Sequence, residues 1–432
     1  MKTNINVAVI GLGYVGLPLA LQFARSDTTV LGLDIDAAKV AAINEGRSYI
    51  KHIGAGGIAG LVKAGRFCAS TDFSRVKEVE AVIICVPTPL NKNREPDISY
   101  ILNTGKSVAP HLREGALVVL ESTTYPGTTD EDLRAVLEAG SGMKAGVGFH
   151  LAYSPEREDP GNPESKVAEI PKVIGGFTPA CLERAKALYG RAIKTLVPVS
   201  SCRVAEATKL TENIFRSVNI ALVNELKIIY SAMGIDVWEV LEAAKTKPFG
   251  FMPFYPGPGL GGHCIPIDPF YLTWKAREFV QTTRFIELAG EINTAMPAYV
   301  VAQATAALNA AHKPVNGSKI LILGLAYKAD VDDDRESPGY VLMDLFKERG
   351  AAVSYYDPHV PVIKRNREHP HWAGYKSAAW QASVIKSFDL VVIVTRHRDI
   401  NYGELAEWAA CIVDTRNAMA LIKTRPGQVF KA

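Results

Sequence analysis

Short apolar runs that end in glycine or polar residues recur along the first part of the chain. Residues 6–10 (N-V-A-V-I) form a β-branched run with turn glycines directly behind it, which predicts a buried parallel strand. Comparable runs predict further strands at 29–33, 81–86, 116–120 and 148–153. A helical segment over 17–25 follows the first run, so this part is predicted to be a doubly wound α/β domain.

The period changes to 3.6 over residues 201–233, which predicts one long helix. Its apolar stripe consists of Val204, Ala207, Leu210, Ile214, Val218, Leu222 and Leu226. The helical pattern resumes over 271–311, and a polar Pro/Gly linker begins at His312. Beyond it, strand-like runs predict a second α/β unit, with strands at 319–323, 352–356, 390–395 and 411–414.

The predicted fold class is therefore α/β, with two Rossmann-like doubly wound domains joined by a central α-helical layer. A chain of 432 residues is too long for a single core. We expect domains at 1–200, 201–311 and 312–432.

Composition narrows the class of partner. The charge is nearly balanced, with 48 Lys and Arg against 45 Asp and Glu, so nothing argues for a nucleic-acid partner. The six cysteines include no C-x-x-C pair, which disfavours a disulfide framework or zinc site and fits a reducing cytoplasm. Since no apolar run approaches the roughly 20 residues that cross a bilayer, we expect a soluble cytoplasmic protein with a small-molecule substrate and no membrane partner.

The loop after the first predicted strand reads Gly-Leu-Gly-Tyr-Val-Gly. In a dinucleotide-binding loop Gly11 would allow the tight turn, Gly13 the approach of a pyrophosphate, and Gly16 the packing of the following helix. Asp34 ends the second predicted strand about 20 residues later, where a carboxylate can accept both ribose hydroxyls and favours NAD over NADP. The alternative is a glycine-rich turn with a solvated Asp34.

Polar residues follow the later strands of the same domain. The carboxyl ends of strands face the ligand in a doubly wound sheet, so Thr88 and Thr123, with its Ser and Thr neighbours, are expected to line the cleft. The alternative is that these threonines cap helices. Glu156 lies in Ser-Pro-Glu-Arg after the last run and could serve as a base, whereas Glu158 and Asp159 resemble solvated loop charges.

Residues 257–269 contain four glycines and three prolines around one cysteine and one aspartate. This composition predicts a rigid turn that holds a side chain in a cleft, and Cys264 is the candidate nucleophile. A reactive thiol needs a nearby cation that favours the thiolate. Lys209 and Asn213 lie four residues apart, so both can meet a single ligand from one helical face. The alternative is two solvated residues.

Two groups of residues contain potential metal ligands but do not predict a metal site. The acidic group lacks the glycine and the distal glutamate of a calcium loop, and consists of Asp330, Asp332, Asp333 and Asp334. The histidines have no ligand spacing and are expected at the surface; they are His359, His369, His371 and His397.

Five motifs occur in one order along the chain: Gly-Leu-Gly-Tyr-Val-Gly, Ser-Pro-Glu-Arg, Lys-Leu-Thr-Glu-Asn, Gly-Gly-His-Cys-Ile-Pro-Ile-Asp and Asp-Asp-Arg-Glu-Ser-Pro. Together they resemble, over essentially the whole chain, the UDP-sugar 6-dehydrogenase family of four-electron dehydrogenases. Within that family the surroundings of Cys264 look most like the UDP-N-acetylglucosamine 6-dehydrogenases that supply surface polysaccharide pathways. One departure is Ile267, where many UDP-glucose dehydrogenases have a lysine near the cofactor.

The resemblance implies an NAD-binding domain, a central helical dimerisation domain and a UDP-binding domain, in a homodimer or higher homo-oligomer. The implied catalytic residues are Cys264, Lys209, Asn213, Asp268, Glu156 and Thr123. NAD would be bound by Gly11, Gly13, Tyr14, Val15, Gly16, Asp34, Lys39, Thr88, Thr123 and Arg335. The UDP-sugar would be bound by Glu156, Lys209, Asn213, Pro253, Phe254, Tyr255, Pro256, Gly257, Gly261 and Lys328.

The implied reaction takes the C6 hydroxyl to a carboxylate through a thiohemiacetal and a thioester on Cys264. Either Glu156 or Asp268 would activate the water that releases the acid. A two-electron dehydrogenase or epimerase, and a non-catalytic nucleotide sensor, are the competing classes. The stretch 248–262 contains no charged residue, which favours UDP-N-acetylglucosamine, with UDP-N-acetylgalactosamine next and UDP-glucose after it.

Overall fold

The computed structural model describes residues 7–432 except 51–52, 92, 94, 158–166, 263 and 367, and only the backbone of Ala55 and Cys264. Glu158 and Asp159, predicted to be loop charges, lie outside the described residues. The chain divides into two compact units, which are described separately. The first comprises residues 1–213 and 270–282, and the second comprises 214–269 and 283–432.

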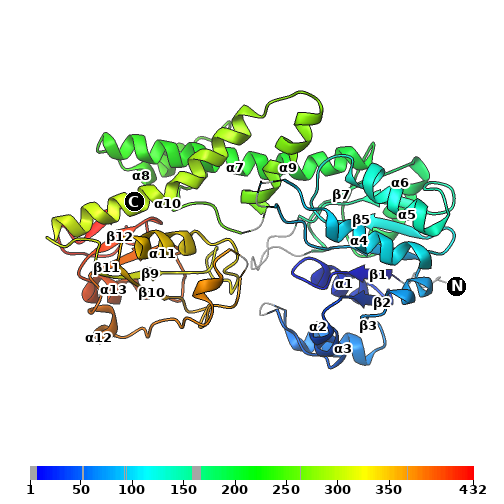
Figure 1. Cartoon of the computed structure of the whole chain (residues 1–432), viewed down its shortest axis with the longest axis horizontal. Helices are drawn as coiled ribbons and strands as arrows, with labels where there is room; N and C mark the ends of the chain where they lie inside the picture. Colours follow the sequence, from blue (N-terminus) through cyan, green and yellow to red (C-terminus); the bar gives the residue numbers. More distant parts are fainter. Residues whose placement is uncertain are drawn as a thin grey trace. The chain divides into compact units, whose positions relative to one another are not determined.

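The first unit is built on an eight-stranded sheet with the order β3-β2-β1-β4-β5-β6-β7-β8 (Figure 1). Every neighbouring pair is parallel except β6 and β7. The strands are β1 Val7–Ile10, β2 Val30–Leu33, β3 Phe67–Ser70, β4 Ala81–Ile84, β5 Leu117–Leu120, β6 His150–Tyr153, β7 Lys172–Gly176 and β8 Leu196–Val199. Strand β1 pairs with β2 on one side and with β4 on the other, so the strand order changes direction at β1. Sheets of this kind bind ligands beyond the carboxyl ends of the strands at such a point.

Helices cover both faces of this sheet, so its central strands are buried throughout. Val7 and Val9 pack against the core that includes Leu17 of α1, whereas Ala8 and Ile10 pack on the opposite side. This alternation follows from the period of two along a strand. The helices are α1 Gly16–Arg25, α2 Ala37–Asn44, α3 Ala55–Lys63, α4 Ser99–Val108, α5 Arg134–Ser141 and α6 Pro179–Tyr189, with short helical turns at Phe73–Glu78, Ala109–His111 and Thr128–Leu133.

The second unit contains a five-stranded, wholly parallel sheet of order β10-β9-β11-β12-β13. Its strands are β9 Lys319–Leu323, β10 Ala352–Tyr356, β11 Leu390–Ile393, β12 Ile412–Asp414 and β13 Val429–Lys431. The helices are α8 Val237–Ala244, α10 Arg284–Ala310, α11 Pro338–Glu348, α12 Ala382–Ile385 and α13 Tyr402–Trp408, with a helical turn at Pro370–Trp372. The predicted fold class of two doubly wound α/β sheets with a long helical region is confirmed.

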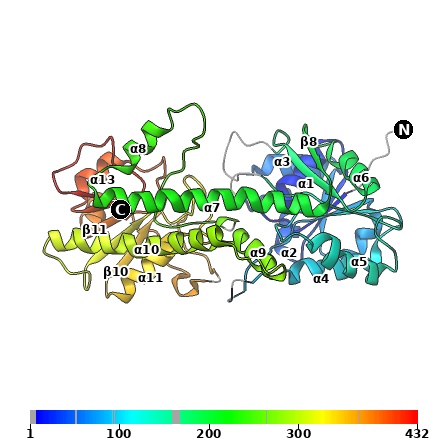
Figure 2. The same cartoon turned by 90° about the horizontal axis from the view of Figure 1, so that it is seen from above.

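The predicted long helix is α7, Cys202–Ala232, which Figure 2 shows as one unbroken helix. Its predicted apolar stripe is not a buried one: Leu210 is fully buried, but Val204 and Leu222 are exposed. Its buried positions include six polar residues, which are Glu206, Lys209, Asn213, Ser217, Asn224 and Lys227. The period identified the helix correctly, but polar partners on neighbouring elements determine which face is buried.

The predicted rigid turn at 257–269 is only partly a turn. Helix α9, Cys264–Glu278, begins within it. Pro266 is compatible with that helix because it lies in the first turn, where backbone N–H groups have no intrahelical acceptor. Among the described helices, none has the length and apolarity that a membrane-spanning segment requires.

Candidate active site

The glycine loop after β1 has the space that a dinucleotide needs. Gly11 has a φ of +89°, and a Cβ there would lie 2.3 Å from the Cys85 carbonyl oxygen. A Cβ on Gly16 would lie 1.9 Å from the Gly11 oxygen, whereas one on Gly13 would meet nothing within 4 Å. Tyr14 is half-buried against the core of the sheet. Gly11 and Gly16 are therefore required by local packing, and Gly13 leaves the open side where a pyrophosphate would approach.

Asp34 is fixed at the end of β2 and is buried, which excludes the solvated alternative. Its Oδ2 accepts the Leu12 amide at 2.8 Å and its Oδ1 accepts the Asp36 amide at 2.9 Å. The Lys39 ammonium lies 3.7 Å from the same carboxylate. Tyr49 donates to the Leu12 carbonyl at 2.5 Å, and burial followed by the charge of Asp34 raises the pKa of Tyr49. These bonds hold the glycine loop and Asp34 in one arrangement.

The threonines predicted to line the cleft lie beyond β4 and β5. Ser122 ties these strand ends together, since its hydroxyl donates to the Val86 carbonyl at 2.8 Å and accepts the Val86 amide at 3.0 Å. The Thr88 carbonyl accepts the hydroxyl of Tyr271. Thr123 follows Ser122 and is half-buried. Neither Thr88 nor Thr123 occupies the N-cap of a described helix, so the capping alternative is not observed.

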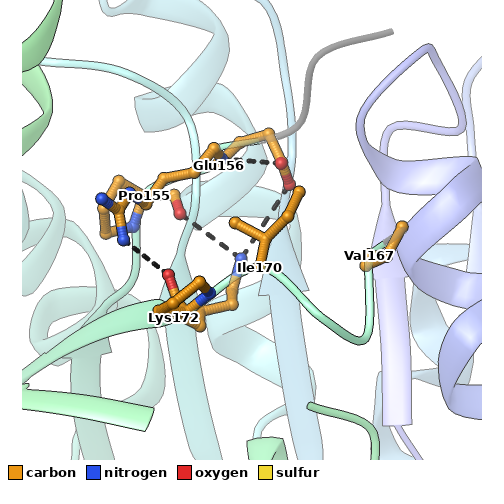
Figure 3. Close-up of a pocket in the computed structure, with 7 residues that line it drawn as sticks. Pro155, Glu156, Val167, Ile170 and Lys172 are labelled. Carbon is orange, nitrogen blue, oxygen red and sulfur yellow. Dashed lines mark hydrogen bonds and ion pairs between the residues drawn. The ribbon is translucent and has the colours of Figure 1, made fainter. Parts of the chain in front are cut away.

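Glu156 lies just beyond β6, beside a small pocket (Figure 3). Lys209 donates to its backbone oxygen at 2.5 Å, and Arg157 pairs with Glu212, one turn of α7 further on, at 2.7 Å. Lys209 and Asn213 are both buried, which excludes the alternative of two solvated residues. The pocket is lined by Pro155, Glu156, Arg157, Val167, Ile170, Pro171 and Lys172.

Two sets of buried polar residues in this unit were not predicted from the sequence. Glu121, at the end of β5, accepts hydrogen bonds from Lys172, at the start of β7, and from Tyr189. Glu206 of α7 accepts the amides of Gly127 and Thr129 at 2.8 and 2.9 Å. The position of Glu121 directly after a buried strand was a usable signal, since Thr123 was selected because it lies just beyond the end of the same strand.

The aromatic residues of the predicted substrate segment pack onto the helices. Phe254 meets Phe215 edge-on with ring centroids 5.6 Å apart. Tyr255 stacks on Trp238 of α8 at 5.7 Å, and its hydroxyl donates to Glu242 at 2.7 Å. Pro253 is exposed and Pro256 is buried. The side chains of Phe254 and Tyr255 are therefore held by the helices.

The glycines that follow are required by close approach of the C-terminal sheet's loops. A Cβ on Gly257 would lie 2.4 Å from a guanidinium nitrogen of Arg416, and one on Gly261 or Gly262 would strike Tyr327 at 2.9 or 2.8 Å. The Gly257 amide donates to Asn224 of α7 at 3.0 Å. Burial lowers the pKa of Arg416 to about 10. Arg416, a half-buried cation just beyond β12, was not predicted from the sequence.

The remaining predicted residues of this unit lie on α9 and after β9. Asp268 is buried four residues after Cys264, so the two positions share one face of α9. Lys328 is half-buried in the loop that follows β9. The Arg335 guanidinium forms a two-pronged contact with Asp333, at 2.8 and 2.6 Å.

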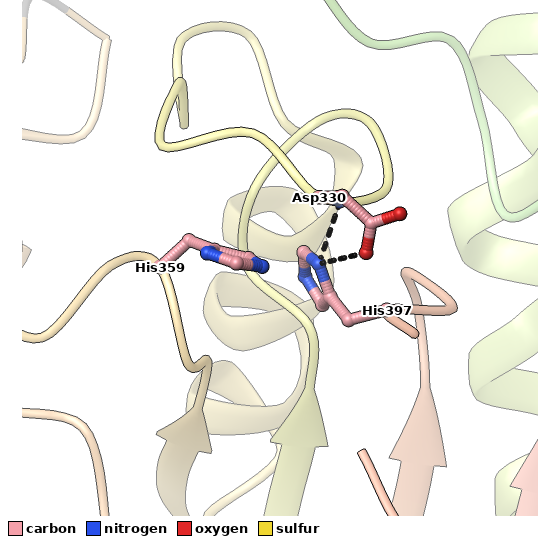
Figure 4. Close-up of side chains that lie close together, drawn as sticks. All are labelled: Asp330, His359 and His397. Carbon is pink, nitrogen blue, oxygen red and sulfur yellow. Dashed lines mark hydrogen bonds and ion pairs between the residues drawn. The ribbon is translucent and has the colours of Figure 1, made fainter. Parts of the chain in front are cut away.

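The prediction of surface histidines is wrong for His397, which is fully buried (Figure 4). Its Nδ1 accepts the Asp330 amide at 3.0 Å and its Nε2 lies 3.0 Å from Asp357. Asp330 is in turn bound by Arg398. His359 comes close enough for the three side chains to resemble a metal site. However, the His397 Nδ1 lone pair and both Asp330 oxygens already accept hydrogen bonds from protein groups.

Comparison with known proteins agrees with this geometry. Three family descriptions match consecutive parts of the chain: the UDP-glucose/GDP-mannose dehydrogenase NAD binding domain at 5–193, its central domain at 203–295 and its UDP binding domain at 321–420. A UDP-N-acetyl-D-glucosamine 6-dehydrogenase of Pseudomonas aeruginosa is 39% identical over 85% of this chain and 86% of its own length. A UDP-N-acetyl-D-mannosamine dehydrogenase of Salmonella typhi is 40% identical, over 90% and 93%.

Among solved structures, that of the UDP-D-ManNAc dehydrogenase from Pyrococcus horikoshii superposes with a TM-score of 0.87 at 32% identity, covering 99% of this chain and 98% of that one. The glycine loop, Asp34 and the two doubly wound sheets define an NAD-dependent oxidoreductase. The chain belongs to the UDP-glucose/GDP-mannose dehydrogenase family and is a UDP-sugar dehydrogenase.

Proposed function

We propose that the protein oxidises the C6 alcohol of a UDP-N-acetylhexosamine to the carboxylate, with UDP-N-acetylglucosamine as the preferred substrate. The net reaction consumes the alcohol, two NAD⁺ and one water, and yields the carboxylate, two NADH and three protons. The observation that carries the proposal is the burial of Lys209 and Asn213 on one face of α7, with Lys209 bound to the peptide oxygen of Glu156. The Lys209 amine is thereby held next to the loop that follows β6, which supports a role for this side chain at the reacting carbon.

The proposed NAD site consists of the glycine loop with Tyr14 and Val15, together with Asp34, Lys39, Thr88, Thr123 and Arg335. Bound NAD supplies the hydride acceptor for both oxidations. The open side of Gly13 and the fixed Asp34 carboxylate fit the pyrophosphate and the adenosine ribose, respectively. Lys39 lies beside Asp34 and would contact the same ribose.

In the first oxidation the C6 hydroxyl loses its proton to Lys209, or to a water held by Asp268 and Thr123, as the hydride leaves C6. The Cys264 sulfur then attacks the aldehyde carbon, a C–S bond forms, and the carbonyl electron pair becomes an oxyanion. Lys209 and Asn213 stabilise that oxyanion. Loss of the second hydride restores the carbonyl and gives a thioester on Cys264.

Water releases the product from the thioester. Its oxygen adds to the carbonyl carbon, its proton passes to Glu156, the C–S bond breaks, and Cys264 leaves as thiolate. We assign this base to Glu156, because Lys209 holds its backbone oxygen and Glu156 lines the small pocket beyond β6. Asp268, on the same face of α9 as position 264, is the second candidate.

We place the UDP-sugar against Glu156, Lys209 and Asn213, the backbone of 253–257, Gly261 and Lys328. The absence of charge over 248–262 favours an acetamide at C2, which needs an apolar surface and one or two hydrogen bonds. The named relatives act on N-acetylated sugars that differ in configuration at C2, which supports the acetamide and leaves UDP-N-acetylmannosamine as a competitor. UDP-N-acetylgalactosamine and UDP-glucose are two further candidate substrates.

Two measurements on one preparation test the proposal. Two NADH per sugar consumed are expected for the four-electron reaction, whereas one or none would identify a two-electron dehydrogenase or epimerase. No turnover at all would indicate a nucleotide sensor. Specificity constants for the four UDP-sugars should favour UDP-N-acetylglucosamine over UDP-glucose by about 10- to 200-fold, the effect of losing the acetyl contacts. A preference for UDP-glucose would contradict the role of 248–262.

We also propose a division into an NAD-binding part (1–200), a central helical part (201–311) and a UDP-binding part (312–432). The central helices would form a homodimer or a larger homo-oligomer. This is supported by exposed apolar residues on α7, notably Phe215, Leu222 and Ile229, which recur every seven residues along one face. The expected setting is the cytoplasm, where the acid would serve as a surface polysaccharide precursor.

A further inference from the structure

Three buried polar side chains behind Glu156 have no part in the steps above. The Lys172 ammonium lies 2.8 Å from Glu121 Oε2 and 3.4 Å from the Pro155 carbonyl oxygen. It also lies 3.9 Å from Glu156 Oε2, and a dashed line in Figure 3 joins the two side chains. The Tyr189 hydroxyl donates to the other oxygen of Glu121. Glu121 directly follows β5, Lys172 begins β7 and Tyr189 ends α6, so two strands of the sheet and a helix packed on it hold the three side chains.

This arrangement fixes the position of the Lys172 ammonium. Both Glu121 oxygens are engaged, one by Tyr189 and one by Lys172, so the carboxylate cannot rotate without breaking a hydrogen bond. Lys172 has three donor hydrogens, and besides Glu121 its ammonium has the Pro155 oxygen at 3.4 Å and the Glu156 carboxylate at 3.9 Å. Burial lowers the pKa of Lys172, but the charges of Glu121 and Glu156 outweigh burial and raise it, so the side chain is a cation.

We propose that Lys172, anchored by Glu121 and Tyr189, is a positioning residue that holds the Glu156 carboxylate in the orientation required for acid release. The inference rests on the proposed function, in which Glu156 accepts the proton of the attacking water while the C–S bond to Cys264 breaks. Lys172 reaches this step only through Glu156.

The alternative role for this group is purely structural. A buried ion pair can be retained only because removing one partner leaves the other charge uncompensated. A structural role predicts that variants lose stability, or lose every catalytic step in parallel. A positioning role predicts that one step slows while the others keep their rates, and this difference can be measured.

The test uses the full-length protein with both charges of the pair removed together. The double variant Lys172→Met/Glu121→Gln removes both charges of the buried Lys172–Glu121 pair, so neither is left without the other, and the new amide oxygen can still accept the Tyr189 hydroxyl. Lys172→Arg keeps the cation and serves as the conservative variant. Lys194→Met is the matched control, since Lys194 forms an exposed ion pair with Glu169 in the same unit. Folding is verified by thermal melting and NAD binding.

Each variant is mixed with UDP-sugar and NAD, and three quantities are measured. They are the rate of the first hydride transfer, the mass of the peptide containing Cys264 and the rate of acid release. The double variant should release acid about 10- to 100-fold more slowly, the range expected when a reacting group is displaced by about 1 Å. The acyl adduct should accumulate on Cys264, with the first hydride transfer within about twofold of wild type. Lys172→Arg and Lys194→Met should behave like the wild type.

Glu156→Gln, measured in parallel, distinguishes a failure of the inference about Lys172 from a failure of the proposed function. If Glu156→Gln accumulates the adduct and the folded double variant releases acid at the wild-type rate, the inference about Lys172 is wrong and the proposed function stands. Equal slowing of every step in the double variant also overturns the inference, in favour of a structural role. If Glu156→Gln itself releases acid normally, the assignment of the base fails, and the inference fails with it.

Discussion

Cys264 is the first residue of α9, and Asp268 follows one turn later on the same helical face. The thiol is required for the covalent steps of the proposed reaction and for little else. Cys264→Ala should therefore abolish acid formation while the affinities for NAD and UDP-sugar stay within about threefold, because only the sulfur atom is removed. Product analysis and equilibrium titration measure both quantities. Cys68→Ala, on strand β3, is the control, and acid formed at the wild-type rate by Cys264→Ala would exclude the thioester.

Glu206 couples the stability of the first unit to pH. Burial raises the pKa of Glu206 from 4.5 to about 7, against the opposing hydrogen bonds from Thr129 and Gly127. A carboxyl group with a raised folded-state pKa contributes stability below pH 4.5 that is lost as the pH rises through about 7. From the size of the shift, that loss is about 3 kcal/mol. Thermal melting of wild type and Glu206→Gln between pH 4.5 and 8 should show their difference changing over this window.

Glu138 provides a control of opposite sign for this measurement. Its hydrogen bond from Lys144 holds the pKa below its usual value, so its contribution is present above pH 4.5 and is lost as the pH falls. The difference in thermal stability between wild type and Glu138→Gln should therefore change only below about pH 4.5. An unchanged difference between wild type and Glu206→Gln from pH 4.5 to 8 would show that Glu206 does not titrate in this range.

The sequence points to single residues where they follow a strand. Asp34, Thr123 and Glu156 were selected because parallel strands end at a common edge, and their roles stay predictions. Lys172 was missed because a lone lysine at the start of a strand resembles a surface charge, and its partner Glu121 lies 51 residues away. The burial of His397 escaped notice for the same reason, since it depends on partners from other loops.

At the scale of elements, the turn around Gly257 contacts both α7, through Asn224, and the loop that carries Arg416. Gly257→Ala would place a Cβ 2.4 Å from the Arg416 guanidinium, so the turn or Arg416 must move, at a cost of about 1 to 3 kcal/mol. If this backbone meets the UDP-sugar as proposed, KM for the sugar should rise about 10- to 100-fold while KM for NAD is unchanged.

Steady-state kinetics with each substrate varied in turn measure this effect. Gly60→Ala is the matched control, because a Cβ on that glycine of α3 would meet nothing within 4 Å. An equal rise in both KM values would mean that the turn acts through global packing. An unchanged KM for the sugar would place the substrate elsewhere.

The elements themselves differ in how far sequence predicts them. The runs at 319–323 and 352–356 match β9 and β10 residue for residue, because β-branched and aromatic runs bounded by glycine or aspartate have few alternatives. Strand β3 was missed, since Phe67–Ser70 is short and lacks β-branched residues. In α7 the period fixed the helix, but the buried face depends on polar partners such as Asn293, which bonds to Asn224 at 2.9 Å.

At the scale of the molecule, each of the two sheets has an aspartate at the end of a strand whose carboxylate accepts backbone amides of a neighbouring loop. Asp34 ends β2 and accepts the Leu12 amide, whereas Asp357 follows β10 and accepts the amides of Leu325 and Ala326 at 2.6 and 2.8 Å. In the second sheet the buried His397 also contacts this carboxylate. The carboxylate of the second sheet is therefore already paired with an imidazole, whereas Asp34 has no such partner among the contacts described for it. The loop after β9, Gly-Leu-Ala-Tyr-Lys-Ala-Asp, also lacks the three-glycine signature of the first sheet.

The exposed apolar face of α7 leads to a prediction for the whole molecule. Phe215, Leu222 and Ile229 are 47%, 49% and 46% exposed although they repeat every seven residues, a pattern typical of a buried helical seam. If a second copy of the chain covers this face, Leu222→Asp would bury an uncompensated charge in the interface and should shift the protein to monomers. Leu421→Asp is the control, since Leu421 is 95% exposed and lies outside the helices. Sedimentation of both variants at several concentrations measures their mass, and a Leu222→Asp protein with unchanged mass would exclude this face as the interface.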